Sequence, residues 1–447
     1  MIRAGICSLA ATLVVLLIAC PNAVAISPPA LDPQVTPPAG NTGPPQPMAQ
    51  RSPCTTAAVL PNTDPEAVSP NQLALNLSDA WQHSRGEGQA VAVIDTGVQP
   101  GPRLPNVDPG GDYVESTDGL TDCDGHGTLV AGLIAGQPGD DGFSGVAPAA
   151  RLIAIRQTSA KFAPRTPGSD PALARAALDV SSLARAIVRA ADLGARVINI
   201  SVVTCVPANK TIEQAELGAA LEYAAVQKDA VVVAAAGNNR SGVGSGSACE
   251  SNAVPDWPGV TSISIPSWWQ PYVLSVGSLT AAGQPSDFTM AGPWLRIAAP
   301  GENVASVSNG GGLANALPND RQELFPISGT SYAAAYVSGV AALVRSKFPD
   351  LTAAQVVRRI TATAHGAARS PSSLVGAGSV DPVAALTWEV PLEEPALAQT
   401  RQIAAPPPPP AENPTPRIVA FAGSGALALV VLATAAIAAH RRKDTTA

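Results

Sequence analysis

Short apolar runs alternate with helical patterns between residues 71 and 388, and this alternation restricts the fold more than any other feature. The runs are rich in β-branched residues, as expected for strands buried on both faces of a parallel sheet. They lie at 90–94, 152–155, 197–200, 231–235 and 273–276, and helical spacing occurs at 126–135, 181–191 and 212–225. Strands and helices in alternation predict an α/β domain with a mostly parallel central sheet. In such a sheet, binding and catalytic residues gather at the carboxyl ends of the strands.

The first 25 residues have the pattern of a secretory signal peptide. A short segment with Arg3 precedes an apolar stretch at 9–19, and the sequence Ala-Val-Ala at 23–25 fits a signal-peptidase site. The mature chain would then begin near Ile26. The alternative is a lipoprotein cleavage box that ends at Cys20. A lipid anchor on Cys20 would be redundant if the other end of the chain carries an anchor of its own.

A charge-free, mainly apolar run at 418–439 predicts that second anchor. About 20 apolar residues in a helix cross a hydrocarbon layer roughly 30 Å thick. The run is followed by His440-Arg441-Arg442-Lys443, and basic clusters of this kind stay on the cytoplasmic side. The sequence therefore predicts one C-terminal transmembrane helix, a cytoplasmic tail at 440–447, and the rest of the mature chain on the extracytoplasmic side of the cell membrane.

Proline-rich segments flank the predicted domain on both sides. Residues 26–70 should be extended or irregular, as a propeptide, a linker or a belt around the domain. Cys54 favours the belt, because a disulfide to the body would keep the segment attached. Residues 389–417 should form a semi-rigid polyproline spacer between the predicted domain at 71–388 and the membrane.

The net charge and the cysteines limit the possible partners and sites. The formal charge is −7 at pH 7, and basic residues cluster only at the C-terminus, so the chain has no electrostatic reason to bind nucleic acid. An even number of cysteines in an exported chain indicates two disulfides, and the spacing leaves all three pairings open. The cysteines that follow the signal segment are Cys54, Cys123, Cys205 and Cys249.

No cofactor or metal site is predicted. The sequence has no Cys-x-x-Cys pair and no Cys/His cluster of the kind that binds zinc. Several acidic residues could in principle hold Ca²⁺, but they lack the spacing of a calcium loop, and we interpret them as solvated loop residues. These residues are Asp118, Asp122, Asp124, Asp140 and Asp141.

Four side chains with complementary chemistry follow the predicted strands or open the predicted helices. Ser331 is a weak nucleophile that needs a base nearby, and His126 can accept and return a proton near neutral pH. Asp95 would fix the tautomer of the imidazole and stabilise its charged form. Asn238 and the backbone N–H of Ser331 would bind the oxygen of a tetrahedral intermediate. The order Asp, His, Ser along the chain is the subtilisin order.

These motifs resemble the signatures of the subtilisin-like serine peptidases, over residues 71–381. They are Asp95-Thr96-Gly97, His126-Gly127-Thr128, Asn238 and Gly329-Thr330-Ser331-Tyr332-Ala333. The signal segment, the belt with Cys54, the spacer and the single C-terminal helix resemble the mycosins, the membrane-anchored subtilases of mycobacterial type VII secretion systems. Segments 122–126 and 264–272 are especially similar to that family and, within it, to the third paralogue.

The resemblance implies a three-layer subtilisin-like domain that cleaves protein or peptide substrates beside a type VII secretion membrane complex. It also implies disulfides Cys54–Cys123 and Cys205–Cys249. One departure concerns Val203, which stands where many subtilases have a cleft-lining glycine. We expect this side chain to narrow the cleft and to make cleavage selective. The alternative function is structural: the domain would stabilise the secretion complex, with proteolysis secondary.

Overall fold

The computed structural model describes residues 26–166, 170–239, 248–254, 256–319, 321–367, 372–391, 421–430, 433–434 and 437. Two units are distinguished by their contacts, Met1–Leu392 and Glu393–Ala447. The predicted signal segment, nearly all of the predicted spacer and the tail at 440–447 lie outside the described residues.

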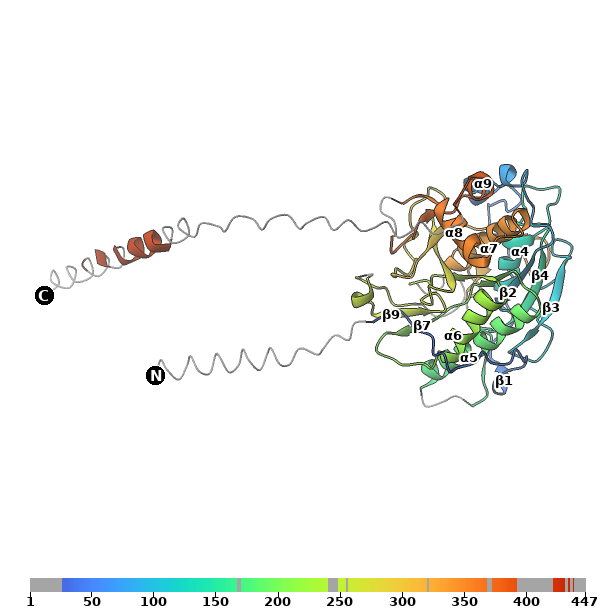
Figure 1. Cartoon of the computed structure of the whole chain (residues 1–447), viewed down its shortest axis with the longest axis horizontal. Helices are drawn as coiled ribbons and strands as arrows, with labels where there is room; N and C mark the ends of the chain where they lie inside the picture. Colours follow the sequence, from blue (N-terminus) through green and yellow to red (C-terminus); the bar gives the residue numbers. More distant parts are fainter. Residues whose placement is uncertain are drawn as a thin grey trace. The chain divides into compact units, whose positions relative to one another are not determined.

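Among the described residues of the first unit, nine strands form one main sheet (Figure 1). Its order is β16-β17-β11-β10-β8-β6-β2-β4-β3, and neighbours run parallel except for β16 and β17. In that order the strands are His365–Gly366, Gly378–Ser379, Ile297–Pro300, Val273–Leu279, Val231–Ala235, Val197–Ile200, Ala90–Asp95, Arg151–Arg156 and Val107–Asp112. All five predicted strands are present and lie next to one another, from β10 to β4.

Successive residues of each central strand point to opposite faces of the sheet, and both faces are buried. In β2, Val91 and Val93 face one hydrophobic core, and Ala92 and Ile94 face the other. The first core is covered by α4 (His126–Ala135), α7 (Thr330–Lys347), α8 (Ala353–Ala362) and α9 (Pro382–Thr387). The second is covered by α5 (Pro171–Asp192) and α6 (Ala215–Glu222), so the body has three layers (Figure 1).

The helices lie where the sequence predicts them, and two of the three differ from the prediction in their ends. The predicted helix at 126–135 is α4 in full. The helix predicted at 181–191 begins earlier, because the Asp170 side chain accepts a hydrogen bond from Leu173 N and Pro171 occupies its first turn. The pattern at 212–225 divides into α6 and a π-helical turn, η1 (Tyr223–Gln227). Shorter helices are α2 (Pro70–Ala74), α3 (Leu77–Ala80) and the 3₁₀ turn η2 (Trp257–Gly259).

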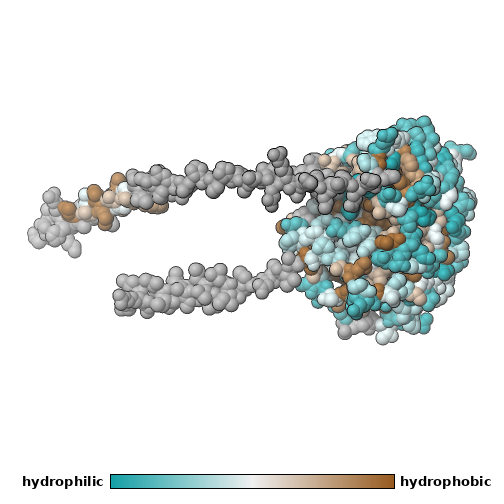
Figure 2. Space-filling view, viewed as in Figure 1, coloured by the Kyte–Doolittle hydropathy of each residue, from teal (hydrophilic) through white to brown (hydrophobic). Residues whose placement is uncertain are grey.

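The remaining strands pair in short antiparallel ribbons. These pairs are β7 (Thr204–Pro207) with β9 (Ser262–Ile265), β12 (Ser306–Val307) with β13 (Leu313–Ala314), and β14 (Ala316–Pro318) with β15 (Leu324–Pro326). The face of the body in Figure 2 is mostly hydrophilic, with hydrophobic residues scattered between, because the sheet's apolar side chains lie inside the two cores.

Residues 26–70, which we call the belt, lie along the body. Strand β1 (Met48–Gln50) of the belt pairs antiparallel with β5 (Phe162–Pro164) of the body. A disulfide joins Cys54 of the belt to Cys123, and a second joins Cys205 to Cys249, which is the pairing that the resemblance implies. The belt is therefore attached to the body by both a strand pair and a covalent bond.

In the second unit, residues 421–430, 433, 434 and 437 are helical. Phe421, Leu427, Leu429 and Val430 are exposed there. Within the described residues, no helix reaches the length and apolar character needed to span a bilayer.

Candidate active site

Asp95 and His126 are in direct contact at the carboxyl edge of the main sheet. Asp95 is the last residue of β2, His126 is the first of α4, and 2.7 Å separates His126 Nδ1 from Asp95 Oδ1. Both side chains are buried. The two elements approach so closely that a Cβ on Gly127 would lie 2.0 Å from the carbonyl oxygen of Gly97. The glycines of the two motifs are thus needed to bring the carboxylate to the imidazole.

The charges around His126 favour its protonated form. Burial alone would lower the pKa of His126, but the carboxylate of Asp95, with those of Asp122 and Asp124, holds it above its usual value of 6.5. The ring of Tyr332 packs against the imidazole, with centroids 5.3 Å apart, and burial raises the pKa of this phenol, which keeps it neutral. The imidazole is therefore held in a site that stabilises an imidazolium ion.

Ser331 lies in the first turn of α7 and is hydrogen-bonded to the loop after β6. Its Oγ donates to the carbonyl oxygen of Ser201 at 2.8 Å, and Ser201 Oγ donates in return to the carbonyl oxygen of Ser331 at 2.9 Å. Asn199 Nδ2 donates to Ser201 Oγ at 2.8 Å and so orients it. His126 Nε2 has no hydrogen-bond partner among the described residues. The Ser331 side chain in this state therefore points to Ser201 and not to the imidazole.

The side chain of Asn238 is fixed by the start of α7. Its Oδ1 accepts hydrogen bonds from both the N–H and the hydroxyl of Thr330, each at 3.0 Å. The Thr330 hydroxyl also accepts from Gly237 N at 3.2 Å, which ties the loop after β8 to the same helix. Because Thr330 holds the amide oxygen, the orientation of the donor group, Nδ2, is fixed as well.

The structure thus joins Asp95 to His126 and places Asn238 against the residue before Ser331, but it does not show a hydrogen bond between Ser331 and His126.

The prediction that the acidic loop residues are solvated is wrong for Asp122 and Asp124, which are buried. Their carboxylates accept hydrogen bonds from the loop before α4 and from neighbouring segments, so burial does not leave them unpaired.

Sequence reasoning missed Ser201 and Thr330 as partners of the site. Ser201 directly follows the run at 197–200, and that position at the carboxyl edge of the sheet was the available signal. Thr330 lies within the motif that contains Ser331, but nothing in the sequence indicates that its hydroxyl orients Asn238.

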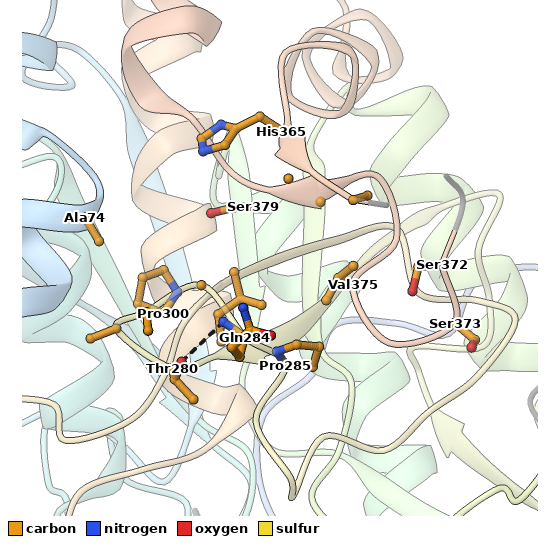
Figure 3. A pocket seen from close by; sticks show the side chains of 17 residues that line it. Ala74, Thr280, Gln284, Pro285, Pro300, His365, Ser372, Ser373, Val375 and Ser379 are labelled. Atoms are coloured by element: carbon orange, nitrogen blue, oxygen red, sulfur yellow. Dashed lines mark hydrogen bonds between the residues drawn. The ribbon is translucent and has the colours of Figure 1, made fainter. Parts of the chain in front are cut away.

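A separate pocket lies where the segment after β10 meets β16 and β17 (Figure 3). Thr280, Gln284, Pro300, His365 and Ser379 are among the residues that line it, and Gln284 N donates to Thr280 Oγ1 at 3.2 Å. None of the four predicted catalytic residues lines this pocket. It therefore does not contribute to the chemistry described above.

Comparison with known proteins identifies the family. The model of the subtilase family matches residues 86–378. Mycosin-3 of Mycobacterium tuberculosis is 62% identical over 460 aligned residues, which cover 100% of both chains. The chain belongs to the mycosins, within the subtilase family. The mycosins are subtilisin-like proteases, so this mycosin is a serine protease with the subtilisin-like α/β fold, and the similarity supports the predicted third paralogue.

Two solved structures are informative about this mycosin. The structure of the MycP3 protease from the type VII (ESX-3) secretion system is 73% identical, has a TM-score of 0.79 and covers 81% of this chain and 100% of that one. A chain in the structure of an intact ESX-5 inner membrane complex is 45% identical, with a TM-score of 0.79, and covers 92% of this chain and 100% of that one.

Proposed function

We propose that this mycosin is an exported, membrane-anchored endopeptidase that cleaves peptide bonds selectively with Ser331 as nucleophile, His126 as general base and Asp95 as the residue that orients the base. The buried contact of 2.7 Å between His126 Nδ1 and Asp95 Oδ1 carries the proposal. This contact assigns the proton of the imidazole to Nδ1 and leaves Nε2 to accept the proton of the nucleophile.

The reaction requires one rotation at Ser331. Its hydroxyl leaves the carbonyl oxygen of Ser201, donates to His126 Nε2 and attacks the scissile carbonyl carbon. The negative oxygen that forms would be bound by the amide nitrogen of Asn238 and by the backbone N–H of Ser331. His126 then passes its proton to the leaving amine, and water hydrolyses the acyl-enzyme by the same steps.

Activity should fall as the solution becomes more acidic, with a midpoint above the usual pKa of histidine, about 6.5. The base must be neutral to accept a proton. The surrounding carboxylates raise the pKa of His126, so on acidification this residue becomes protonated, and activity is lost, at a higher pH than for a free histidine. The pH dependence of kcat/KM for a peptide substrate measures this midpoint. A midpoint below that of free histidine would contradict the assignment.

Val203 should restrict the substrates. Its side chain is half-buried against the first hydrophobic core, two residues after Ser201, whose carbonyl oxygen accepts the hydrogen bond of Ser331. In Val203→Gly, we expect cleavage of poorly accepted peptides to rise by roughly 10-fold or more, because the side chain no longer occupies the cleft. A library of peptides measures the change, and Val254→Gly, at an exposed loop position, is the control. An unchanged library profile would refute the role of Val203.

The place of action is proposed from the termini and from the relatives. The segments at 1–25 and 418–439 would export and anchor the chain, with residues 26–70 as the belt, 71–388 as the peptidase body and 389–417 as the spacer. The exposed apolar side chains at 421–430 suit contact with lipid. Because one relative is part of an ESX-5 inner membrane complex, we propose that this mycosin joins a type VII secretion membrane complex, with its body on the periplasmic side.

The test is a comparison of exported proteins in a host that has a type VII system but lacks its own mycosin of this kind. The host would carry the full chain, Ser331→Ala or no mycosin. New protein N-termini in the medium should appear with the full chain and be missing with Ser331→Ala. If both yield identical termini, the proteolytic proposal fails.

The same experiment addresses a structural role, which the relative in the intact complex favours. Secretion that survives in Ser331→Ala but fails without the chain would show that the mycosin also stabilises the complex. Secretion that is unaffected by loss of the chain would exclude that role.

A further inference from the structure

Asp122 is a buried carboxylate on the loop that leads into α4, and five donors surround it. Its Oδ1 accepts hydrogen bonds from Thr96 Oγ1 at 2.8 Å, Asp124 N at 3.1 Å and Gly125 N at 2.8 Å. Its Oδ2 accepts from the N–H and the hydroxyl of Thr128, at 2.8 and 2.7 Å. Through its bonds to Gly125 and Thr128, the carboxylate therefore fixes the first turn of α4, which contains His126.

The same carboxylate is connected to Asp95. The hydroxyl of Thr96 lies 2.8 Å from Asp122 Oδ1 and 3.2 Å from Asp95 Oδ1, and it accepts a hydrogen bond from Gly127 N at 2.9 Å. One hydroxyl thus joins both carboxylates to the residue after His126. Through it, Asp122 fixes the end of β2 and the start of α4 relative to each other.

We propose that Asp122 is a positioning residue of this protease, which holds the Asp95–His126 pair in the geometry needed for proton transfer. Asp122 itself touches neither the substrate nor the nucleophile. The inference rests on the proposed role of His126 as the base.

The backbone of Asp122 is fixed from the opposite side by the belt. Asn309 Nδ2 donates to the carbonyl oxygen of Asp122 at 3.0 Å and to that of Thr55, in the belt, at 2.9 Å. The next residue, Cys123, carries the disulfide to Cys54. Asp122 is thus held by its side chain at the catalytic pair and by its main chain at the belt, which supports a fixed position for it.

The test measures how fast a fluorophosphonate probe labels the full chain in detergent micelles, as a function of pH, for Asp122→Asn. An amide of the same size cannot accept from all five donors. The rate constant above pH 8 should fall by roughly 10²-fold, the scale of loss from small displacements of catalytic groups. Asp118→Asn, an exposed residue of the same loop, should keep the wild-type rate.

The pH profile separates positioning from a general loss of structure. His126 faces Asp95, Asp122 and Asp124, while Tyr332 stays neutral. Removing one of these three negative charges makes protonation of His126 less favourable, so the acid limb of the profile should move to lower pH in Asp122→Asn. A fall in folded fraction alone would lower the amplitude of labelling and leave the limb in place.

A second pair of variants decides the matter if Asp122→Asn does not fold. Thr96→Val removes the connecting hydroxyl and should slow labelling without moving the acid limb, and Thr96→Ser should restore the rate. Wild-type rates in both Asp122→Asn and Thr96→Val would overturn the positioning role alone. If the folded wild-type chain is not labelled at all, the proposed catalytic function fails, and the positioning role fails with it.

Discussion

Replacing Ser331 with alanine should abolish peptide cleavage, with a loss in kcat of about 10⁶-fold, as in subtilisin when its serine is removed. The hydroxyl is the only group of this side chain that can form the acyl-enzyme. Ser331 lies at the start of α7, and within the described residues alanine removes a single side-chain hydrogen bond, from Ser331 Oγ to Ser201 O, so the variant should fold normally. Hydrolysis of a fluorogenic peptide library by the full chain measures the loss.

The matched control is Ser346→Ala. Ser346 lies near the other end of α7 and donates to the carbonyl oxygen of Glu87 at 3.0 Å. This variant should retain wild-type activity. Cleavage that persists in Ser331→Ala at the wild-type rate would assign the nucleophile to another residue.

Replacing Asp95 with asparagine should lower kcat by about 10⁴-fold and change KM little. Asp95 Oδ1 accepts one hydrogen bond from His126 Nδ1 at 2.7 Å and another from Thr96 N at 2.7 Å. An asparagine that donates to Nδ1 would place the imidazole proton on Nε2. In that tautomer, His126 Nε2 can no longer accept the proton of Ser331. Steady-state kinetics on one cleaved peptide separate kcat from KM.

Asp108→Asn is the control for this change, because Asp108 forms an exposed ion pair with Arg151 and lies in the edge strand β3, two strands away from β2. Its activity should equal that of the wild type. A loss of only a few-fold in Asp95→Asn would mean that the carboxylate does not set the tautomer of His126.

The central strands could be predicted because they are buried on both faces and therefore consist of apolar residues. Strand β3 could not be predicted, since its sequence Val-Asp-Pro-Gly-Gly-Asp has no apolar run. Within the described part of the chain, it is an edge strand that pairs with β4 alone. The start of α5 was also missed, because it depends on the cap at Asp170 and on Pro171 and not on the apolar periodicity.

The residue types of the candidate site could be predicted because the chemistry requires them after strands and at helix starts. The contacts that hold these residues in place could not be predicted from the sequence. Nothing in the sequence distinguishes Asp122 from a solvent-exposed acidic residue, and only the fold shows that Thr96 and Thr128 enclose its carboxylate. The orientation of Ser331 toward Ser201 depends on a side-chain rotation that no sequence pattern records.

The central claim is that Ser331 is a nucleophile activated by His126, and mapping the attachment site of a fluorophosphonate by mass spectrometry tests it most directly. The full chain is treated with the probe in detergent micelles and digested, and the modified peptide is sequenced. We predict a single adduct on Ser331 that disappears in His126→Ala. An adduct on another residue, or one on Ser331 that forms equally fast in His126→Ala, would contradict the account.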